Sequence, residues 1–444
     1  MASLVVVSII LGCAAFQYFK GTIIKAFATI IIAICAGMVA FGFFEFSANL
    51  IISRGDSGTL LSIAPWAQTL CFILIFVVVF ALLQTGATYL LHHPVDLGFL
   101  PERIGSVICG LILGLIVSGL LLTALAMGPL SLSYPYKRFD PMSLKPDAPD
   151  KALLNVDGFA TGLFSMVSKG SFRGKRSFAT IHPNYLDQLF LNRLINVDST
   201  SIISNKFPAI SVPRPPKHAV WPASKAISDQ VDGYVDQLKR QAGKIKYDPD
   251  QQSKSVPLPV STKGSYDPTI VRVGIKKMAI RGDAKINGGA FTPSQLRLIC
   301  KRKGYGRDPL AGNAINAYPI GYLKSADQMQ ISPEIKLSTQ DIEGSEKFID
   351  FVFCLPSGFE PVLVEYKLNS IVEILPRAIL TDISKAPELA TFSPSSGGSR
   401  NRSNRKQNRP SGPAQQQQQT ETSPDGRGLS DTSKSILGPG FDEE

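Results

Sequence analysis

The first 130 residues of this 444-residue chain contain very little charge. Only eight Lys, Arg, Asp or Glu side chains occur there, four of each sign, although the whole chain has a net charge of +11. Residues 131–392 hold 35 basic and 25 acidic side chains, and residues 393–444 hold 7 and 6. This uneven distribution excludes a single soluble domain, and the apolar composition excludes a wholly disordered chain.

Histidine is also scarce, with four residues in the chain. His92 and His93 lie close to Asp96, but no third metal ligand is evident beside them, and His182 and His218 are isolated in the sequence. No paired-cysteine metal motif and no phosphate-binding glycine loop occur. We therefore expect no metal and no cofactor.

A catalytic motif occurs once, in an unsuitable place. Residues 55–58 read Gly-Asp-Ser-Gly and resemble the nucleophile motif of chymotrypsin-like proteases. The motif falls in a short loop between two apolar runs, which leaves no room for the paired barrels that hold a catalytic triad. Because no other credible catalytic set is found, we expect that the protein is not an enzyme.

Four long apolar runs occupy the region that lacks charge. A helix needs about 20 mainly apolar residues to cross a bilayer, and lipid forces backbone hydrogen bonds to be made within each segment. No basic residue precedes the first run, so the basic start of a signal peptide is missing and we expect the run to be retained. The sequence therefore predicts four transmembrane helices, roughly over Leu4–Phe19, Ala26–Phe44, Pro65–Leu91 and Ile104–Pro129.

Small residues recur at helical spacing in two of these runs. Gly110, Gly114 and Ser118 follow one another every four residues in the fourth run, and Ala33 and Gly37 do so in the second. Small side chains at this spacing form a groove that lets another helix approach closely. The pattern predicts helix packing within a bundle.

The same region resembles the colicin V production protein (CvpA) family. One matching turn contains Lys20, Gly21 and Lys25, with Lys20 where the family usually has Arg. The second match is the Glu102–Arg103 pair, followed by Gly105, Gly110 and Gly114 along the last span. The resemblance covers about residues 1–130. It implies a four-helix membrane domain and a link to toxin production or export, with no chemistry to transfer.

The orientation in the membrane is nearly balanced on charge. Lys20, Lys25 and Arg103 fall in the first and third loops, whereas Arg54 and the pair at 137–138 lie at the opposite end. The resemblance favours a cytoplasmic first loop, and some membrane-tethered serine proteases join a CvpA-like region to an exported domain. We therefore expect a bacterial inner-membrane protein whose termini and soluble part face the periplasm or exterior.

The rest of the chain reads as an appended soluble α+β region. Ile227, Val231 and Val235 recur at helix spacing, which favours a helix docked on its own domain over a coiled coil or a membrane-surface helix. A second helix is expected over 295–303, after Thr292 as N-cap. The expected parts are a Pro-rich linker (131–150), a helical or irregular region (151–222), an amphipathic helix (223–247), a linker (248–265), a β-rich, possibly sandwich-like domain (266–392) and a disordered tail (393–444).

Two cysteines fall in the region expected to be exported. Cys300 and Cys354 would be able to form one disulfide there. In the tail, five basic residues between 400 and 409 have no acid among them. This pattern is typical of a solvated tail, and contact with anionic lipid or a wall polymer is the alternative. No aromatic residue interleaves with the basic residues, so no nucleic acid is expected.

Two classes of function fit these features. The first is a non-enzymatic multi-pass anchor or scaffold in envelope homeostasis or toxin export, in contact with the bilayer and with other envelope proteins. The second is a small-solute channel or transporter, and a membrane-tethered enzyme is third. Few polar side chains besides Glu45, Gln68 and Gln84 are available inside the runs, which favours the scaffold. Glu45 lies near the end of its span, so it is either functional or exposed at the interface. The sequence gives no oligomeric state.

Overall fold

The computed structural model describes most of the chain before residue 391. The described residues are 2–53, 64–90, 99–131, 133–140, 144–169, 177–194, 209–241, 260–261, 264–280, 290–304, 310–331, 335–337, 341–342, 344–368 and 370–390. The Gly-Asp-Ser-Gly sequence, Arg54, the histidines at 92 and 93 and the whole tail from 393 lie outside them. Most of the expected linker over 248–265 does so as well.

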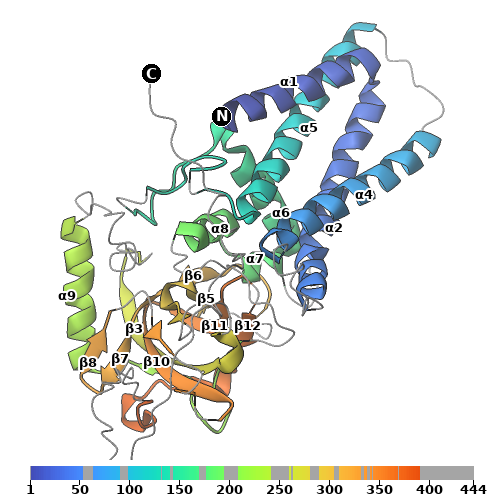
Figure 1. Cartoon of the computed structure of the whole chain (residues 1–444). Coiled ribbons are helices and arrows are strands. Elements are labelled where there is room, and N and C mark those ends of the chain that lie inside the picture. Colours follow the sequence, from blue (N-terminus) through green and yellow to red (C-terminus); the bar gives the residue numbers. More distant parts are fainter. Residues whose placement is uncertain are drawn as a thin grey trace, which may run out of the picture. The chain divides into compact units, whose positions relative to one another are not determined.

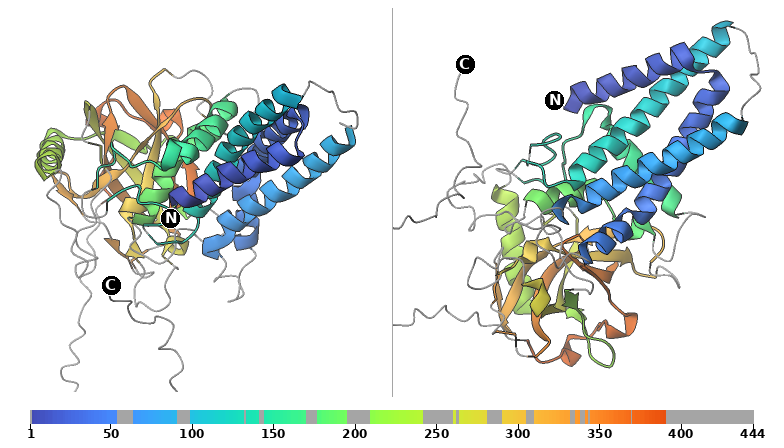
Figure 2. Two further views of the ribbon diagram at one scale, coloured as in Figure 1. Left: turned by 90° about the horizontal axis from the view of Figure 1, so that it is seen from above. Right: turned by 45° about the vertical axis from the view of Figure 1, so that its right-hand side comes forward.

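Four helices are long and apolar enough to cross a membrane, as the sequence predicts. Helix α1 pairs with α5 and helix α2 pairs with α4, while α5 also contacts α2 (Figures 1 and 2). Many of their large apolar side chains are exposed, as expected for surfaces that lipid covers. The helices are α1 (Ala2–Lys20), α2 (Ile23–Ser53), α4 (Ala67–Leu90) and α5 (Phe99–Met127).

The glycine groove of α5 packs against α1. A Cβ atom built on Gly110 would lie 2.7 Å from Cα of Ala14, and one on Gly114 would lie 2.6 Å from Cα of Ile10. Ser118 is fully buried in the same row. These approaches confirm the predicted helix packing. Gly37 of α2 makes a different contact, because its missing Cβ leaves room for the ring of Phe164.

Gly110→Ala is expected to destabilise the bundle by about 1–3 kcal/mol, because the added methyl group meets backbone atoms that cannot rotate away. The control is Gly12→Ala in α1, where nothing lies within 4 Å of the place that the methyl group would take, so the better helix propensity of Ala is gained without a clash. Thermal unfolding of both variants in detergent measures the difference. Equal melting temperatures would contradict the close packing of α1 on α5.

Residues 131–169 do not separate the bundle from the rest of the chain. The expected linker is packed on it: Arg138 and Phe139 are buried, and Arg138 forms an ion pair of 2.6 Å with Asp187. Helix α6 (Val156–Lys169) lies against α5, where the backbone of Val156 occupies the space beside Gly119. A Pro-rich composition predicts an extended chain, but it does not show whether apolar side chains such as Phe139 anchor that chain.

Two short helices follow α6 and join the same core. They are α7 (Phe178–Ile181) and α8 (Tyr185–Leu194). Tyr185, Leu189 and Phe190 are buried in one cluster with side chains of α2, α4 and α5. Leu368, from the sheet region, belongs to this cluster too. These helices lie in the region expected to be helical or irregular (151–222), and they are part of the contact between the bundle and the sheets.

The β-rich region forms two larger antiparallel sheets around one apolar core (Figure 1). The first has the order β1-β3-β10-β7-β8, with β2 paired to β3, and the second has the order β12-β11-β5-β6. Both contribute side chains to the core, and the sandwich-like arrangement stays a prediction. The strands are β1 (Ile210–Ser211), β2 (Val220–Pro222), β3 (Tyr266–Lys276), β4 (Ala290–Phe291), β5 (Leu296–Arg302), β6 (Ile315–Ala317), β7 (Pro319–Ser325), β8 (Gln328–Gln330), β9 (Ile335–Lys336), β10 (Glu346–Pro356), β11 (Phe359–Tyr366) and β12 (Ser370–Glu373).

The helix expected over 295–303 is wrong, because this segment is strand β5. Thr292 and Pro293 start only one turn of 3-10 helix, over Pro293–Gln295. Leu298 and Cys300 then face the core between the sheets, while Ile299 faces a separate cluster. Leu298, Ile299 and Cys300 are consecutive apolar residues, and such a run does not show by its periodicity whether it forms a strand or a helix.

The amphipathic helix docks on its own domain, as predicted. Its described part is α9 (Lys225–Gln241), in which Ile227, Val231 and Val235 are fully buried. They pack in one cluster with Trp221 and with side chains on the outer face of the first sheet.

The possible disulfide between Cys300 and Cys354 is not formed, and both cysteines are free. Cys300 lies in the core between the two sheets, whereas Cys354 belongs to the cluster under α9. Neighbouring residues of β10, such as Phe353, face the core instead, so the first sheet separates the two sulfur atoms. Burial also raises the pKa of the Cys354 thiol to about 12, so this group is an unreactive thiol at neutral pH.

Candidate functional site

A chain of buried polar side chains connects helix α2 to the second sheet. Glu45 projects from α2, and His182 follows directly after α7. Gln188 lies on α8, while Glu365 of β11 and Arg297 of β5 face each other as register partners in the sheet. Four of these five residues are at most 4% exposed, and only Glu45 is partly exposed. Residues far apart in the sequence thus meet at one place.

The contacts run in sequence from the membrane helix to the sheet. His182 Nε2 lies 2.9 Å from Glu45 Oε1, and its Nδ1 lies 3.0 Å from Gln188 Oε1. Gln188 Nε2 then donates to Glu365 Oε2 at 3.0 Å. Glu365 also accepts from Nε of Arg297. We call these five residues the junction network.

The hydrogen bonds of the network are all satisfied by a doubly protonated His182. Gln188 must direct its NH2 group toward the Glu365 carboxylate, which only accepts, so its carbonyl oxygen faces His182 Nδ1. Nδ1 therefore donates, and Nε2 donates to the carboxylate of Glu45. An imidazole that donates from both nitrogens is an imidazolium. Burial lowers the pKa of His182, whereas the charge of Glu45 and its hydrogen bond raise it. The raising effects outweigh burial, so the pKa of His182 lies above the ordinary 6.5.

Charge is balanced within the network in this state. The positive charges of the His182 imidazolium and the Arg297 guanidinium offset the negative charges of the Glu45 and Glu365 carboxylates. Burial raises the pKa of Glu365, while the Arg297 charge opposes that effect. A buried carboxylate without a cation would be strongly destabilising, so Arg297 and His182 together keep the sheet end of the network stable.

Arg297 also fixes the backbone that carries His182. Its Nη2 donates to the carbonyl oxygen of Ile181 at 2.9 Å, and its Nη1 donates to Asn316 Oδ1 at 2.7 Å. The amide of Asn316 in turn donates to the carbonyl of Pro183 at 2.6 Å. The residues on both sides of His182 are thus bonded to the sheet, which holds the imidazolium in position beneath α2.

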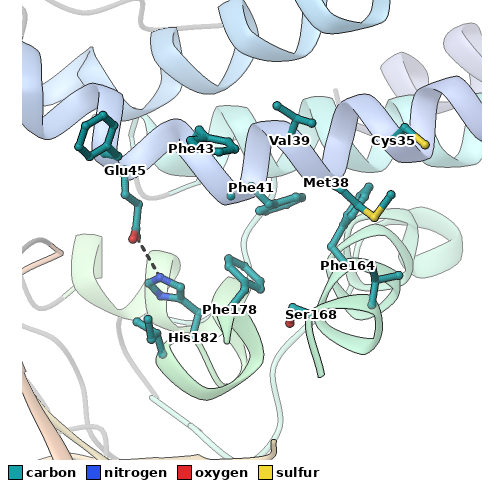
Figure 3. Close-up of a pocket in the computed structure, with 14 residues that line it drawn as sticks. Cys35, Met38, Val39, Phe41, Phe43, Glu45, Phe164, Ser168, Phe178 and His182 are labelled. Atoms are coloured by element: carbon teal, nitrogen blue, oxygen red, sulfur yellow. Dashed lines mark ion pairs between the residues drawn. The ribbon is translucent and has the colours of Figure 1, made fainter. Parts of the chain in front are cut away.

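An apolar pocket of about 600 Å³ adjoins the network on the side of α2 (Figure 3). The Glu45–His182 pair lies at one end of it, and Cys35 and Met38 lie toward the other. The remaining lining residues come from α2, α6 and α7 and are mostly aromatic or aliphatic. Ser168 is the other polar residue in the lining, and its hydroxyl donates to the carbonyl of Ser165 at 2.9 Å and accepts from the amide of Ala179 at 3.0 Å. It is therefore engaged by backbone rather than by His182.

The motif residues shared with the CvpA-like pattern lie elsewhere, around the α1–α2 turn. Arg103 donates to the carbonyl of Tyr18 and stacks over its ring, with 5.4 Å between Cζ and the ring centroid. A Cβ on Gly105 would meet Ile23, and one on Gly21 would meet Gln17. These residues hold α1, α2 and α5 together at the end where α1 turns into α2. Lys20 and Lys25 are exposed beside them, and Glu102 lies in the first turn of α5.

Sequence reasoning misses most of the junction network. His182 looks isolated in the sequence because the other four residues of the network come from four other elements. A signal is present in the strands, where Arg297 and Glu365 each interrupt an apolar run. A charged residue inside a run of buried strand residues requires a partner, and opposite charges on two such runs indicate that the strands are neighbours.

Within the described ranges, no group of three or more His, Cys, Asp or Glu residues is placed to hold a metal ion. Comparisons with protein-family models, with curated proteins and with solved structures found no match to the chain.

Proposed function

We propose that this protein is a non-enzymatic membrane anchor that holds its two-sheet domain in a fixed position against a four-helix bundle. The observation that carries the proposal is the junction network, in which a side chain of a membrane-crossing helix is bonded through His182 and Gln188 to the sheet. The apolar cluster shared by the bundle, α8 and Leu368 surrounds this contact. A domain joined by a flexible tether would not need buried, charge-balanced contacts of this kind.

The biological setting rests on the resemblance to the CvpA family. A role in envelope homeostasis or in toxin production and export, at a bacterial inner membrane, is the corresponding proposal. The excess positive charge of residues 131–392 suits anionic lipid headgroups or wall polymers as the surface that the domain meets. Other envelope proteins are the second class of partner.

The arrangement of charge supports an exported domain. Lys20, Lys25 and Arg103 gather at the end of the bundle formed by the α1–α2 turn and the start of α5. At the opposite end, Arg138 is buried in its ion pair with Asp187 and does not reach lipid headgroups, and Lys137 pairs with Asp140 at 3.1 Å. These two ion pairs reduce the positive charge that the residues after α5 set against the first and third loops. The charge distribution then favours a cytoplasmic first loop.

Reporter fusions after Asp140 and after Phe392 test the orientation. We expect a periplasmic reporter, such as alkaline phosphatase, to be active at both positions and a cytoplasmic reporter to be inactive. A fusion within the α1–α2 turn is the control and should give the reverse result. Cytoplasmic activity after both Asp140 and Phe392 would overturn the exported location of the domain.

Solute flux separates the anchor from the channel. The full chain is reconstituted into liposomes loaded with ions and small neutral solutes, and release is compared with that from empty liposomes. We expect no release above the control, because an anchor needs no polar path through the bundle. Release that depends on the protein, and that is lost when Gln68 or Gln84 is replaced by Leu, would contradict the anchor and support the channel.

A further inference from the structure

The pocket beside helix α2 is open toward the surface that faces lipid. Phe43 and Phe46 belong to its lining and are 57% and 68% exposed. Helix α6 forms the opposite wall through Phe164 and Val167, and its own outer side exposes Phe159 and Met166. Both walls therefore continue into exposed apolar surface, which is unfavourable in contact with water. An occupant of the pocket is therefore expected to come from the bilayer.

The position of the pocket along α2 matches one leaflet. Glu45 lies twenty residues after Lys25, which is about 30 Å of helix, and the hydrocarbon core of a bilayer is about 30 Å thick. With Lys25 at one headgroup layer, Glu45 is at the other. Cys35 lies ten residues back, about 15 Å away and therefore near the bilayer midplane. The lining of the pocket runs between these two levels along α2, from Glu45 to Cys35 (Figure 3). That depth is about half of the hydrocarbon core, which is the depth that one acyl chain occupies.

The polar end of the pocket selects the headgroup. The Glu45 carboxylate is 30% exposed on its side chain, while His182 is almost completely covered. A carboxylate accepts hydrogen bonds and repels anions, so a fatty acid or an anionic head would be disfavoured. A primary ammonium donates hydrogen bonds to the exposed side of this carboxylate, whose other side faces the buried His182, whereas a trimethylated ammonium has no N–H to donate. From these observations we propose that the pocket binds one acyl chain of an ethanolamine phospholipid, whose ammonium group donates to Glu45.

Lipid retention by the purified full chain tests this proposal. The protein is placed in nanodiscs made from equal amounts of ethanolamine and choline phospholipids with the same acyl chains. It is then released, and the lipids that remain bound are counted by native mass spectrometry. We expect one retained lipid, with an ethanolamine-to-choline ratio of about ten, as one hydrogen bond to a charged group supplies. A chain that retains no lipid, or that retains both headgroups equally, would overturn the proposal.

Gly42→Phe is the variant that fills the pocket. Gly42 lines it, and nothing lies within 4 Å of the position of its missing Cβ, so the new ring adds bulk to the wall of the pocket without a backbone clash. Gly86→Phe on α4 is the matched control, since the space around Gly86 is equally open and it is not part of the lining. We expect Gly42→Phe to lose the retained lipid and Gly86→Phe to keep it. Equal retention in the two variants would contradict binding in this pocket.

Glu45→Gln separates the headgroup from the acyl chain. The amide oxygen still accepts from His182, but the negative charge that favours an ammonium is lost. We expect this variant to retain a lipid while its preference for ethanolamine over choline falls several-fold. An unchanged preference would show that Glu45 does not contact the headgroup and would overturn that part of the proposal. Because this variant adds no volume, its result is independent of how well Gly42→Phe folds.

Discussion

Arg297→Met lowers the stability of the two-sheet domain by about 3–5 kcal/mol, the usual loss when one partner of a buried ion pair is removed. Arg297 is 3% exposed on its side chain and Glu365 is fully buried, so the substitution leaves a carboxylate without its cation in a region that water does not reach. The variant also loses the bonds from Arg297 to Ile181 and Asn316. The position of His182 against α2 depends on those bonds, so the contact with the bundle weakens together with the domain.

Thermal unfolding of the full chain in nanodiscs measures this effect, and we expect a fall in melting temperature of roughly 10 °C. Arg302→Met is the matched control, because Arg302 ends the same strand and is exposed. That substitution should change the stability by no more than about 0.5 kcal/mol. Adding Glu365→Gln to Arg297→Met should restore a large part of the loss, since the unpaired charge is removed. Equal melting temperatures for the two single variants would contradict a structural role for the Arg297–Glu365 pair.

Glu45→Gln lowers the pKa of His182 and makes the contact between bundle and domain less dependent on pH. Four charged or titratable groups face His182: Glu45 from α2, Glu365 from β11, Arg297 from β5 and the Tyr185 ring from α8. Glu45 is the largest contribution that raises the His182 pKa. Without its charge, burial and Arg297 both favour the neutral imidazole.

The sign of the pH effect follows from the raised pKa of His182. A group whose pKa is higher in the folded state contributes stability that is fully present below its unfolded pKa of 6.5. This contribution is lost as the pH rises through the folded pKa. The wild-type contact is therefore strongest under mildly acidic conditions and weakens as the pH rises. We expect Glu45→Gln to lose about 1 kcal/mol at low pH, because Glu45 is partly exposed, and to change little as the pH rises.

Nitrogen chemical shifts of labelled histidine report the pKa directly. Only four histidines are present, and His182→Gln identifies the signal of interest. Glu102→Gln is the control, since Glu102 lies in the first turn of α5, far along the bundle from His182. The His182 pKa should fall in Glu45→Gln and stay unchanged in Glu102→Gln. The same titration in both variants would contradict the ion pair between α2 and His182.

The sequence predicts the bundle well, because membrane spans depend on local composition. Each of the four helices follows from an apolar run, and the Gly110–Gly114 spacing predicts the close approach of another helix. A helix is predicted in place of strand β5, because Leu296–Arg302 is buried on both faces and its apolar residues do not alternate. The Cys300–Cys354 pairing fails for a related reason, since the face of the sheet on which each thiol lies depends on strand register.

The junction network depends on tertiary contacts that local patterns do not contain. His182 has no charged neighbour in the sequence, and its role comes from the way Arg297 and Asn316 fix the backbone around it. Glu45 stands out as the unusual charge near the end of a span, but its partner lies more than a hundred residues away. Helices α6, α7 and α8, in the region expected to be helical or irregular (151–222), pack into the same core as α2 and α5, which local patterns do not predict.

A distance measurement tests most directly whether the domain is held rigidly against the bundle. Spin labels are introduced as non-canonical amino acids at Leu90 of α4 and at Lys385, which are both exposed, so that the native cysteines remain. Pulsed electron resonance in nanodiscs then gives the distribution of distances between the labels. We predict one narrow distribution in the wild type, which broadens in His182→Ala. A broad wild-type distribution that His182→Ala leaves unchanged would contradict a domain held in place by the junction network.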